Sequence, residues 1–219
     1  MPYYDPRMVP AHGESTATVL LVNEAPGPCE AHYQIPSVGA QGGNIYRFFR
    51  RAGIKWAKDF EAFSWPRLIR ERYKRPDKME KAFKCRDEFL RVRAAHMTCT
   101  NAFPLWPRNA MNVWDFVDPD KADVLADENI RRLAAEVPRD HRVILVCGVF
   151  AWLACLGTPL ERPASREGTA IKGEELAVIN RRLLAHFRAG WYMGHTRRWA
   201  LQKDRVTAVL RTAAKVAEW

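Results

Sequence analysis

The sequence lacks several patterns that identify a class of protein at once. Its five scattered cysteines contain no C-x-x-C pair, so neither a zinc knuckle nor a disulfide framework is indicated. It also lacks a phosphate-binding loop and a cluster of metal ligands. No run of about 18 apolar residues exists, and prolines and acidic residues occupy the first positions, where a secretory signal needs an apolar segment. We therefore expect a soluble cytoplasmic protein with reduced thiols, no membrane partner, no metal and no cofactor.

Positive charge is what the sequence has in excess. Its 35 Lys and Arg residues outnumber 25 Asp and Glu residues, which gives a net charge of +10 and favours a polyanionic partner such as nucleic acid. The 219 residues, 47% of them hydrophobic, suffice for one substantial core. We expect a monomer with a single domain over residues 1–219. Residues 55–96, with thirteen basic and seven acidic side chains, form a basic helical elaboration of it.

Short apolar runs alternate with segments of helical spacing along the chain. The runs are rich in β-branched or aromatic residues and predict strands at residues 18–23, 97–101, 143–147 and 191–194. Helices are predicted at residues 44–52, 60–95, 120–136, 149–156, 174–187 and 203–217. Alternation of this kind indicates parallel strands joined by right-handed crossovers. The predicted fold is a three-layer α/β/α sandwich with a central four-stranded parallel sheet.

Polar residues follow three of the predicted strands. Ligands of such sheets bind beyond the carboxyl ends of the strands, so these residues are candidates for a site. Glu24 could hold a charge and a water beside a reacting carbon, and the amide of Asn101 could read a base edge. The imidazole of His195 could donate to a developing oxyanion. Singly, Glu24 and Asn101 are more typical of a plain turn, and His195 of a surface position, but together the three are expected at one edge of the sheet.

In order and spacing, these segments resemble the uracil-DNA glycosylase superfamily, in particular its family-four members, whose first motif reads G-E-A-P-G. The resemblance spans residues 19–198 and covers residues 55–96 poorly. It rests on Glu24-Ala25-Pro26-Gly27, Pro36-Ser37-Val38-Gly39, Gly42 and Gly43 before a helix ending in Ala52-Gly53-Ile54, Thr100-Asn101, residues 143–148 before a helix, and Gly194-His195.

The resemblance implies a repair enzyme that flips uracil out of DNA and hydrolyses its N-glycosidic bond, leaving an abasic site without lyase activity. Its partner is uracil-containing DNA. The resemblance implies that Glu24 assists hydrolysis and that His195 is the second catalytic residue. Uracil-binding residues are then Asn101, Ala25, Gly27 and a stacking ring from Tyr33 or Phe103. DNA-binding residues are Thr196, Arg197, Arg198 and Trp199, as the loop that fills the gap left by the flipped base, and Gly39.

The sequence departs from the family pattern in several places. Asn23 replaces the glycine that opens the first motif, and Ser37 stands where P-F-V-G places the stacking phenylalanine. The second motif, usually H-P-S-P, reads His195-Thr196-Arg197-Arg198 and has lost its prolines. Family-four proteins bind a [4Fe–4S] cluster through four cysteines beginning with an N-terminal pair, but no cysteine precedes Glu24. We expect no cluster.

Other interpretations stay open at this point. The same fold could bind uracil- or abasic-site DNA without turnover, or excise another base such as hypoxanthine or xanthine. From a different class, a non-catalytic basic module could bind nucleic acid through residues 55–93 and use the strand-end residues only as turns. A nucleotide-metabolising hydrolase is a further possibility, weakened by the lack of a phosphate loop.

Overall fold

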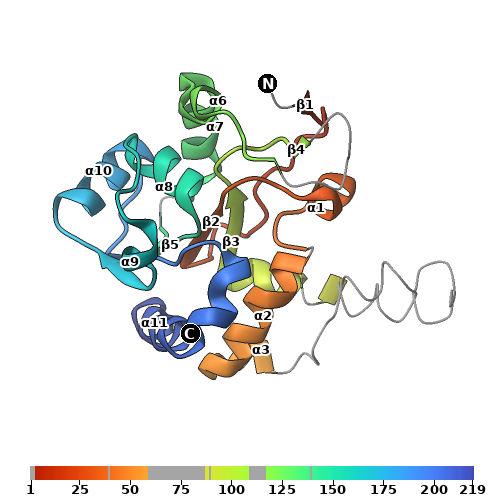
Figure 1. The fold of residues 1–219 in the computed structure, drawn as a ribbon. Helices are drawn as coiled ribbons and strands as arrows, with labels where there is room; N and C mark the ends of the chain where they lie inside the picture. Colours follow the sequence, from red (N-terminus) through yellow and green to blue (C-terminus); the bar gives the residue numbers. More distant parts are fainter. Residues whose placement is uncertain (1–2, 39, 59–86, 89, 109–116, 139) are drawn as a thin grey trace, which may run out of the picture.

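The computed structural model describes residues 3–38, 40–58, 87–88, 90–108, 117–138 and 140–219. At its centre is a five-stranded sheet with the order β3-β2-β5-β7-β6, drawn in Figure 1. Strands β3 (Met97–Asn101), β2 (Val19–Asn23), β5 (Val143–Val146) and β7 (Ala189–Tyr192) run parallel. The edge strand β6 (Thr169–Ile171) pairs antiparallel with β7. Strands β1 (Tyr3–Tyr4) and β4 (Pro107–Arg108) form a separate two-stranded ribbon.

The four predicted strands are therefore confirmed, with ends shifted by at most two residues, and they form the parallel part of the sheet. The fifth strand was not predicted. Strand β6 spans only three residues at the sheet edge, of which one is buried, so it carries too few positions for a periodic pattern.

Helices connect the strands and largely follow the predicted segments. The first half of the chain contains α1 (Pro28–Tyr33), α2 (Ala40–Ala52) and α3 (Lys55–Lys58). The second half contains α6 (Lys121–Leu125), α7 (Asp127–Glu136), α8 (Val149–Leu156), α9 (Pro163–Arg166), α10 (Glu174–Arg182), the 3₁₀ segment η1 (Thr196–Gln202) and α11 (Lys203–Ala217).

Two predicted helices differ from the helices that the structure describes. The segment 120–136 is two helices rather than one, because Ala126 adopts an extended ψ of 136° between α6 and α7. Of the predicted helix at residues 60–95, residues 87–88 and 90–95 are helical, and the rest lies outside the described residues. The basic elaboration at residues 55–96 is described only at its two ends.

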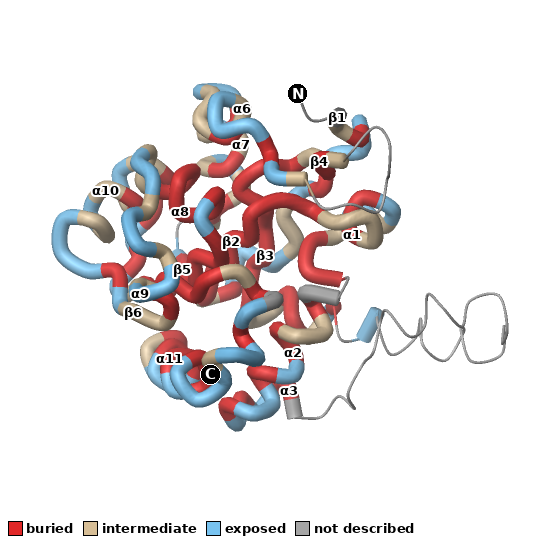
Figure 2. The backbone as a smooth tube through the Cα atoms, in the orientation of Figure 1, coloured by how far each residue is buried: buried red, intermediate tan, exposed pale blue. Residues whose placement is uncertain are grey.

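The sheet is covered by helices on both faces, as expected of an α/β sandwich. Alternate strand residues such as Val19 and Leu21 pack into one core cluster with α2 and α11. The intervening residues, such as Leu20 and Val22, pack into a second cluster with α7, α8 and α10. Every residue of β2, β3 and β5 is buried, so these strands lie at the centre of the molecule (Figure 2). Among the helices that the structure describes, none is long and apolar enough to cross a bilayer.

Candidate functional site

The structure brings two of the predicted site residues into contact. Glu24 directly follows β2, and His195 lies three residues beyond the end of β7, with β5 between these two strands. The Oε2 atom of Glu24 lies 3.5 Å from Nε2 of His195. The carboxylate is 7% exposed and the imidazole 19% exposed. This edge therefore presents an acid and a base side by side, mostly shielded from water.

The carboxylate of Glu24 is also held by α8, the helix that follows β5. Its Oε1 atom accepts a hydrogen bond of 3.2 Å from the backbone N–H of Phe150, in the first turn of α8. The partial positive charge at a helix N-terminus attracts negatively charged groups. Gly148 precedes this helix with a φ of +104°, and a Cβ atom at this position would lie 2.2 Å from Cδ of Glu24. Only glycine therefore allows the helix to approach the carboxylate so closely.

Asn101, the third predicted site residue, ends β3 with a fully buried side chain. Neither Oδ1 nor Nδ2 of its amide has a hydrogen-bond partner among the residues that the structure describes. A buried amide without a partner costs about 1–3 kcal/mol, so most such groups in proteins are paired. An exception calls for an explanation, and a ligand with a complementary donor and acceptor is one.

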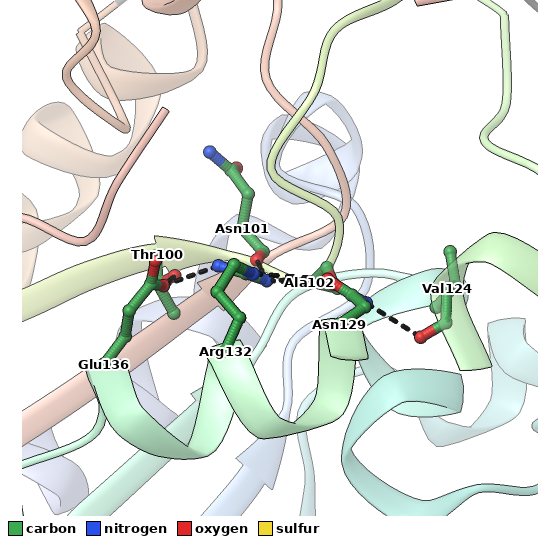
Figure 3. Close-up of polar contacts among 7 residues, drawn as sticks. All are labelled: Thr100, Asn101, Ala102, Val124, Asn129, Arg132 and Glu136. Atoms are coloured by element: carbon green, nitrogen blue, oxygen red, sulfur yellow. Dashed lines mark hydrogen bonds and ion pairs between the residues drawn. The ribbon is translucent and has the colours of Figure 1, made fainter. Parts of the chain in front are cut away.

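The backbone of Asn101 is held firmly although its side chain is not. Arg132 of α7 donates from Nη2 to the carbonyl oxygen of Asn101 at 2.8 Å, and from Nη1 to Oε2 of Glu136 at 2.6 Å. Thr100 donates to the same carboxylate oxygen at 2.6 Å. Figure 3 shows the amide of Asn101 extending away from this network. The network thus fixes the end of β3 and leaves the amide unengaged.

The next residue of the loop is held by the same helix. Asn129 donates from Nδ2 to the carbonyl oxygens of Ala102 and Val124, both at 2.8 Å (Figure 3). Its Oδ1 in turn accepts from Arg132. Arg132 and Asn129 were not predicted from the sequence, because polar residues in an amphipathic helix have no local signal that separates a buried role from an exposed one.

The loop that carries His195 is held by Glu167. This carboxylate is 5% exposed and pairs with Nη1 of Arg198 at 3.0 Å, and it also accepts from the Gln202 side chain. Burial raises the pKa of Glu167, whereas Arg198 and Arg205 lower it. A Cβ atom on Gly194, whose φ is +65°, would lie 2.6 Å from Cγ of Glu167. Arg198, predicted to contact DNA, is therefore half-exposed and already engaged in an ion pair.

Within residues 196–199, the predicted gap-filling loop, the structure places Thr196 and Trp199 in the interior, which corrects the expectation that these two side chains contact DNA. Trp199 is 1% exposed, donates from Nε1 to the carbonyl oxygen of Met193 at 3.0 Å, and packs edge-on against Phe48 of α2. Thr196 is also buried. The segment is a 3₁₀ turn that packs on α2 and α11, so its large side chain belongs to the core. Two of the predicted DNA-binding positions, the side chain of Arg197 and Gly39, lie outside the described residues.

The predicted uracil-binding residues do not come together as Glu24 and His195 do. Phe103 is 7% exposed and packs against Tyr4 at a ring distance of 4.9 Å, within the core cluster on the α7 and α8 face. Ala25 is buried in that same cluster. Tyr33 is half-buried at the end of α1, and Gly27 caps that helix. Phe103 is therefore engaged in core packing, and Tyr33 is the more accessible of the two rings.

Two departures from the expected sequence pattern contact each other. Asn23 donates from Nδ2 to Oγ of Ser37 at 2.8 Å, and both side chains are buried. Ser37 has a φ of +59° and is held through its backbone. Its N–H donates to Glu30, and its carbonyl oxygen accepts from Nη1 of Arg93 at 3.1 Å. Burial raises the pKa of Glu30.

Comparisons with known proteins return nothing that bears on this site: no protein-family model matches the chain, and no curated protein matches it. Within the described residues, no group of three His, Cys, Asp or Glu side chains is placed to hold a metal ion.

Proposed function

We propose that this protein hydrolyses the N-glycosidic bond of uracil in DNA, as the uracil-DNA glycosylase superfamily does. The observation that supports this most is the contact between Glu24 and His195 at the same sheet edge as the unpartnered amide of Asn101. A carboxylate, an imidazole and a base-reading amide are the three groups that the reaction needs. The net charge of +10 suits a DNA substrate.

In the proposed reaction, the bond between C1′ of the sugar and N1 of uracil breaks, and its electron pair leaves with the base. Positive charge develops on the sugar, where the carboxylate of Glu24 stabilises it and orients a water. The water oxygen bonds to C1′ and its proton passes to Glu24. His195 donates a hydrogen bond to the departing uracil anion, while the amide of Asn101 holds the imide edge of the base.

The shielding of the site fits this chemistry. With Glu24 7% exposed, an interaction between its charge and the sugar cation is weakened less by water than on an open surface. The base must leave the duplex to reach such a site, which costs a few kcal/mol of unstacking. The buried amide of Asn101 can return part of this cost, because a matching base edge gives its donor and acceptor their partners.

The test is excision from a labelled duplex that carries one uracil, followed by alkali to cut abasic sites. The expected result is a cut product whose rate falls at least a hundredfold in Glu24→Gln and Asn101→Ala. Glu175→Gln is the matched control, because Glu175 forms a partly exposed ion pair with Arg166 on α9; its rate should equal that of the wild type. Intact DNA with uracil, hypoxanthine and xanthine substrates contradicts the proposal, and gel-shift binding to the same duplexes then tests the non-catalytic alternative.

A further inference from the structure

The two helical layers of the protein differ in charge. The layer of α2, α3 and α11, which packs on one face of the sheet, carries three basic residues in α2, two in α3 and four in α11, against Asp204 as its single acid. The opposite layer of α6, α7, α8 and α10 carries five basic and six acidic residues. The positive charge of these helices is therefore concentrated in the basic layer of α2, α3 and α11 (Figure 1).

The cations of α2 form one ridge on the solvent side of the helix. Arg47, Arg50 and Arg51 are exposed, and their spacing of three and four residues places them on the same helix face. Phe48 and Phe49, which lie between them in the sequence, pack into the core cluster on the other side of the helix. The ridge is thus oriented outward by the packing of α2 on the sheet.

The ridge continues onto α11, which contacts α2. Nε of Arg211 donates to the carbonyl oxygen of Ala52 at 3.4 Å, and Lys215 is exposed one turn further along α11. Of the cations on α2 and α11, Arg51 is the only one that forms an ion pair with a described residue, with Asp204 at 3.3 Å. The positive charges of the ridge therefore repel one another, and a bound polyanion would relieve this repulsion.

A nucleic-acid backbone suits this surface better than an anionic membrane does. Helices that lie on a bilayer insert apolar side chains beside their cations. Four large apolar side chains are exposed among the described residues, and none of them lies in α2, α3 or α11. A surface that presents cations alone can neutralise phosphates, and it does so without reading the bases.

This surface is separate from the sheet edge that carries Glu24 and His195. Helix α2 starts near that edge, where Gly42 lies against the carbonyl group of Ser37, but its cations begin at Arg47, about 8 Å further along the helix. We propose that the basic layer is a second DNA-binding surface, which holds the phosphate backbone of undamaged duplex DNA. It keeps the protein on DNA when no base occupies the site at Glu24 and His195.

The experiment measures the affinity for an undamaged duplex by fluorescence anisotropy at several salt concentrations. Each phosphate contact contributes about 0.9 to the slope of log K against log salt concentration. In the triple variant Arg47→Gln, Arg50→Gln and Lys215→Gln, we expect this slope to become less negative by about 2–3. A constant fraction of inactive protein leaves the slope unchanged, so partial loss of folded protein does not imitate this effect.

The matched control removes the same charge from the opposite layer. Lys121, Arg131 and Arg181 are exposed on α6, α7 and α10, and replacing all three by Gln gives a protein with the same net charge as the first variant. The slope of this control should equal that of the wild type. Its rate of uracil excision at saturating protein should also equal that of the wild type.

The outcomes separate this proposal from the glycosylase proposal. Equal slopes in the two triple variants overturn the second surface, because binding then does not depend on where the charge lies. Binding to phosphatidylserine vesicles without binding to the duplex overturns it as well. Either result leaves the glycosylase proposal standing if uracil is excised. The expected difference in slope without excision of uracil supports the second surface and contradicts the glycosylase proposal instead.

Discussion

Substitution of Gly148 by alanine tests whether the position of Glu24 determines the activity. The new Cβ would lie 2.2 Å from Cδ of Glu24, so the carboxylate must move by about 1 Å to reach ordinary van der Waals contact. That movement breaks its alignment with His195 and with the N–H of Phe150. A displacement of this size at a reacting group costs on the order of a hundredfold in rate. We expect that loss in single-turnover uracil excision.

Gly173→Ala is the control for backbone strain. Gly173 also precedes a helix and has a positive φ, of +60°, but nothing lies within 4 Å of a Cβ atom placed there. Both alanine variants should lose about 1–3 kcal/mol of stability from the positive φ, measured by urea denaturation. Only Gly148→Ala should lose activity. Full activity in Gly148→Ala, with its stability reduced like that of the control, would refute the argument that Glu24 must occupy its observed position.

Three further predictions concern the surroundings of the site. Arg132→Ala should slow uracil excision about tenfold and raise KM more than it lowers kcat, because the carbonyl of Asn101 loses the guanidinium that holds it. Arg132→Lys should restore part of this loss. An unchanged KM in Arg132→Ala would contradict the role of Arg132. Trp199→Ala should cost about 3–5 kcal/mol in urea denaturation, since the indole is 1% exposed, whereas a cost below about 0.5 kcal/mol would indicate the exposed wedge after all. Burial lowers the pKa of His141 from 6.5 to about 4, so the folded state takes up its proton later than the unfolded state as the pH falls. The free energy of unfolding should therefore fall by up to about 3 kcal/mol between pH 6.5 and pH 4. His141→Gln should show a shallower fall in pH-dependent thermal unfolding, and an identical profile would exclude His141 as its source.

The parallel strands could be predicted because their signal is local. Runs such as residues 143–147 are apolar without interruption, which is typical of strands buried on both faces, and β5 is indeed buried throughout. The start of α6 was predicted correctly, where the side chain of Asp120 caps the helix, but the break between α6 and α7 was not predicted. A helical pattern that continues on both sides of Ala126 conceals a change in one backbone angle.

The positions of Glu24, Asn101 and His195 at or shortly after strand ends could be predicted from the sequence alone, because each follows or closes a short run of mostly apolar residues. Composition likewise determined the excess of positive charge. These features depend on residues that are close together in the sequence, so they can be recognised from a single sequence.

The partners of these residues were decided only by the tertiary structure. Gly148 approaches Glu24, Arg132 holds the carbonyl of Asn101, and Asn23 is oriented by Ser37. The burial of Trp199, where an exposed loop was expected, is of the same kind. Each of these contacts joins elements that are neighbours only because of the strand order and the packing of helices on the sheet. The spacing of residues along the sequence encodes neither the strand order nor the helix packing.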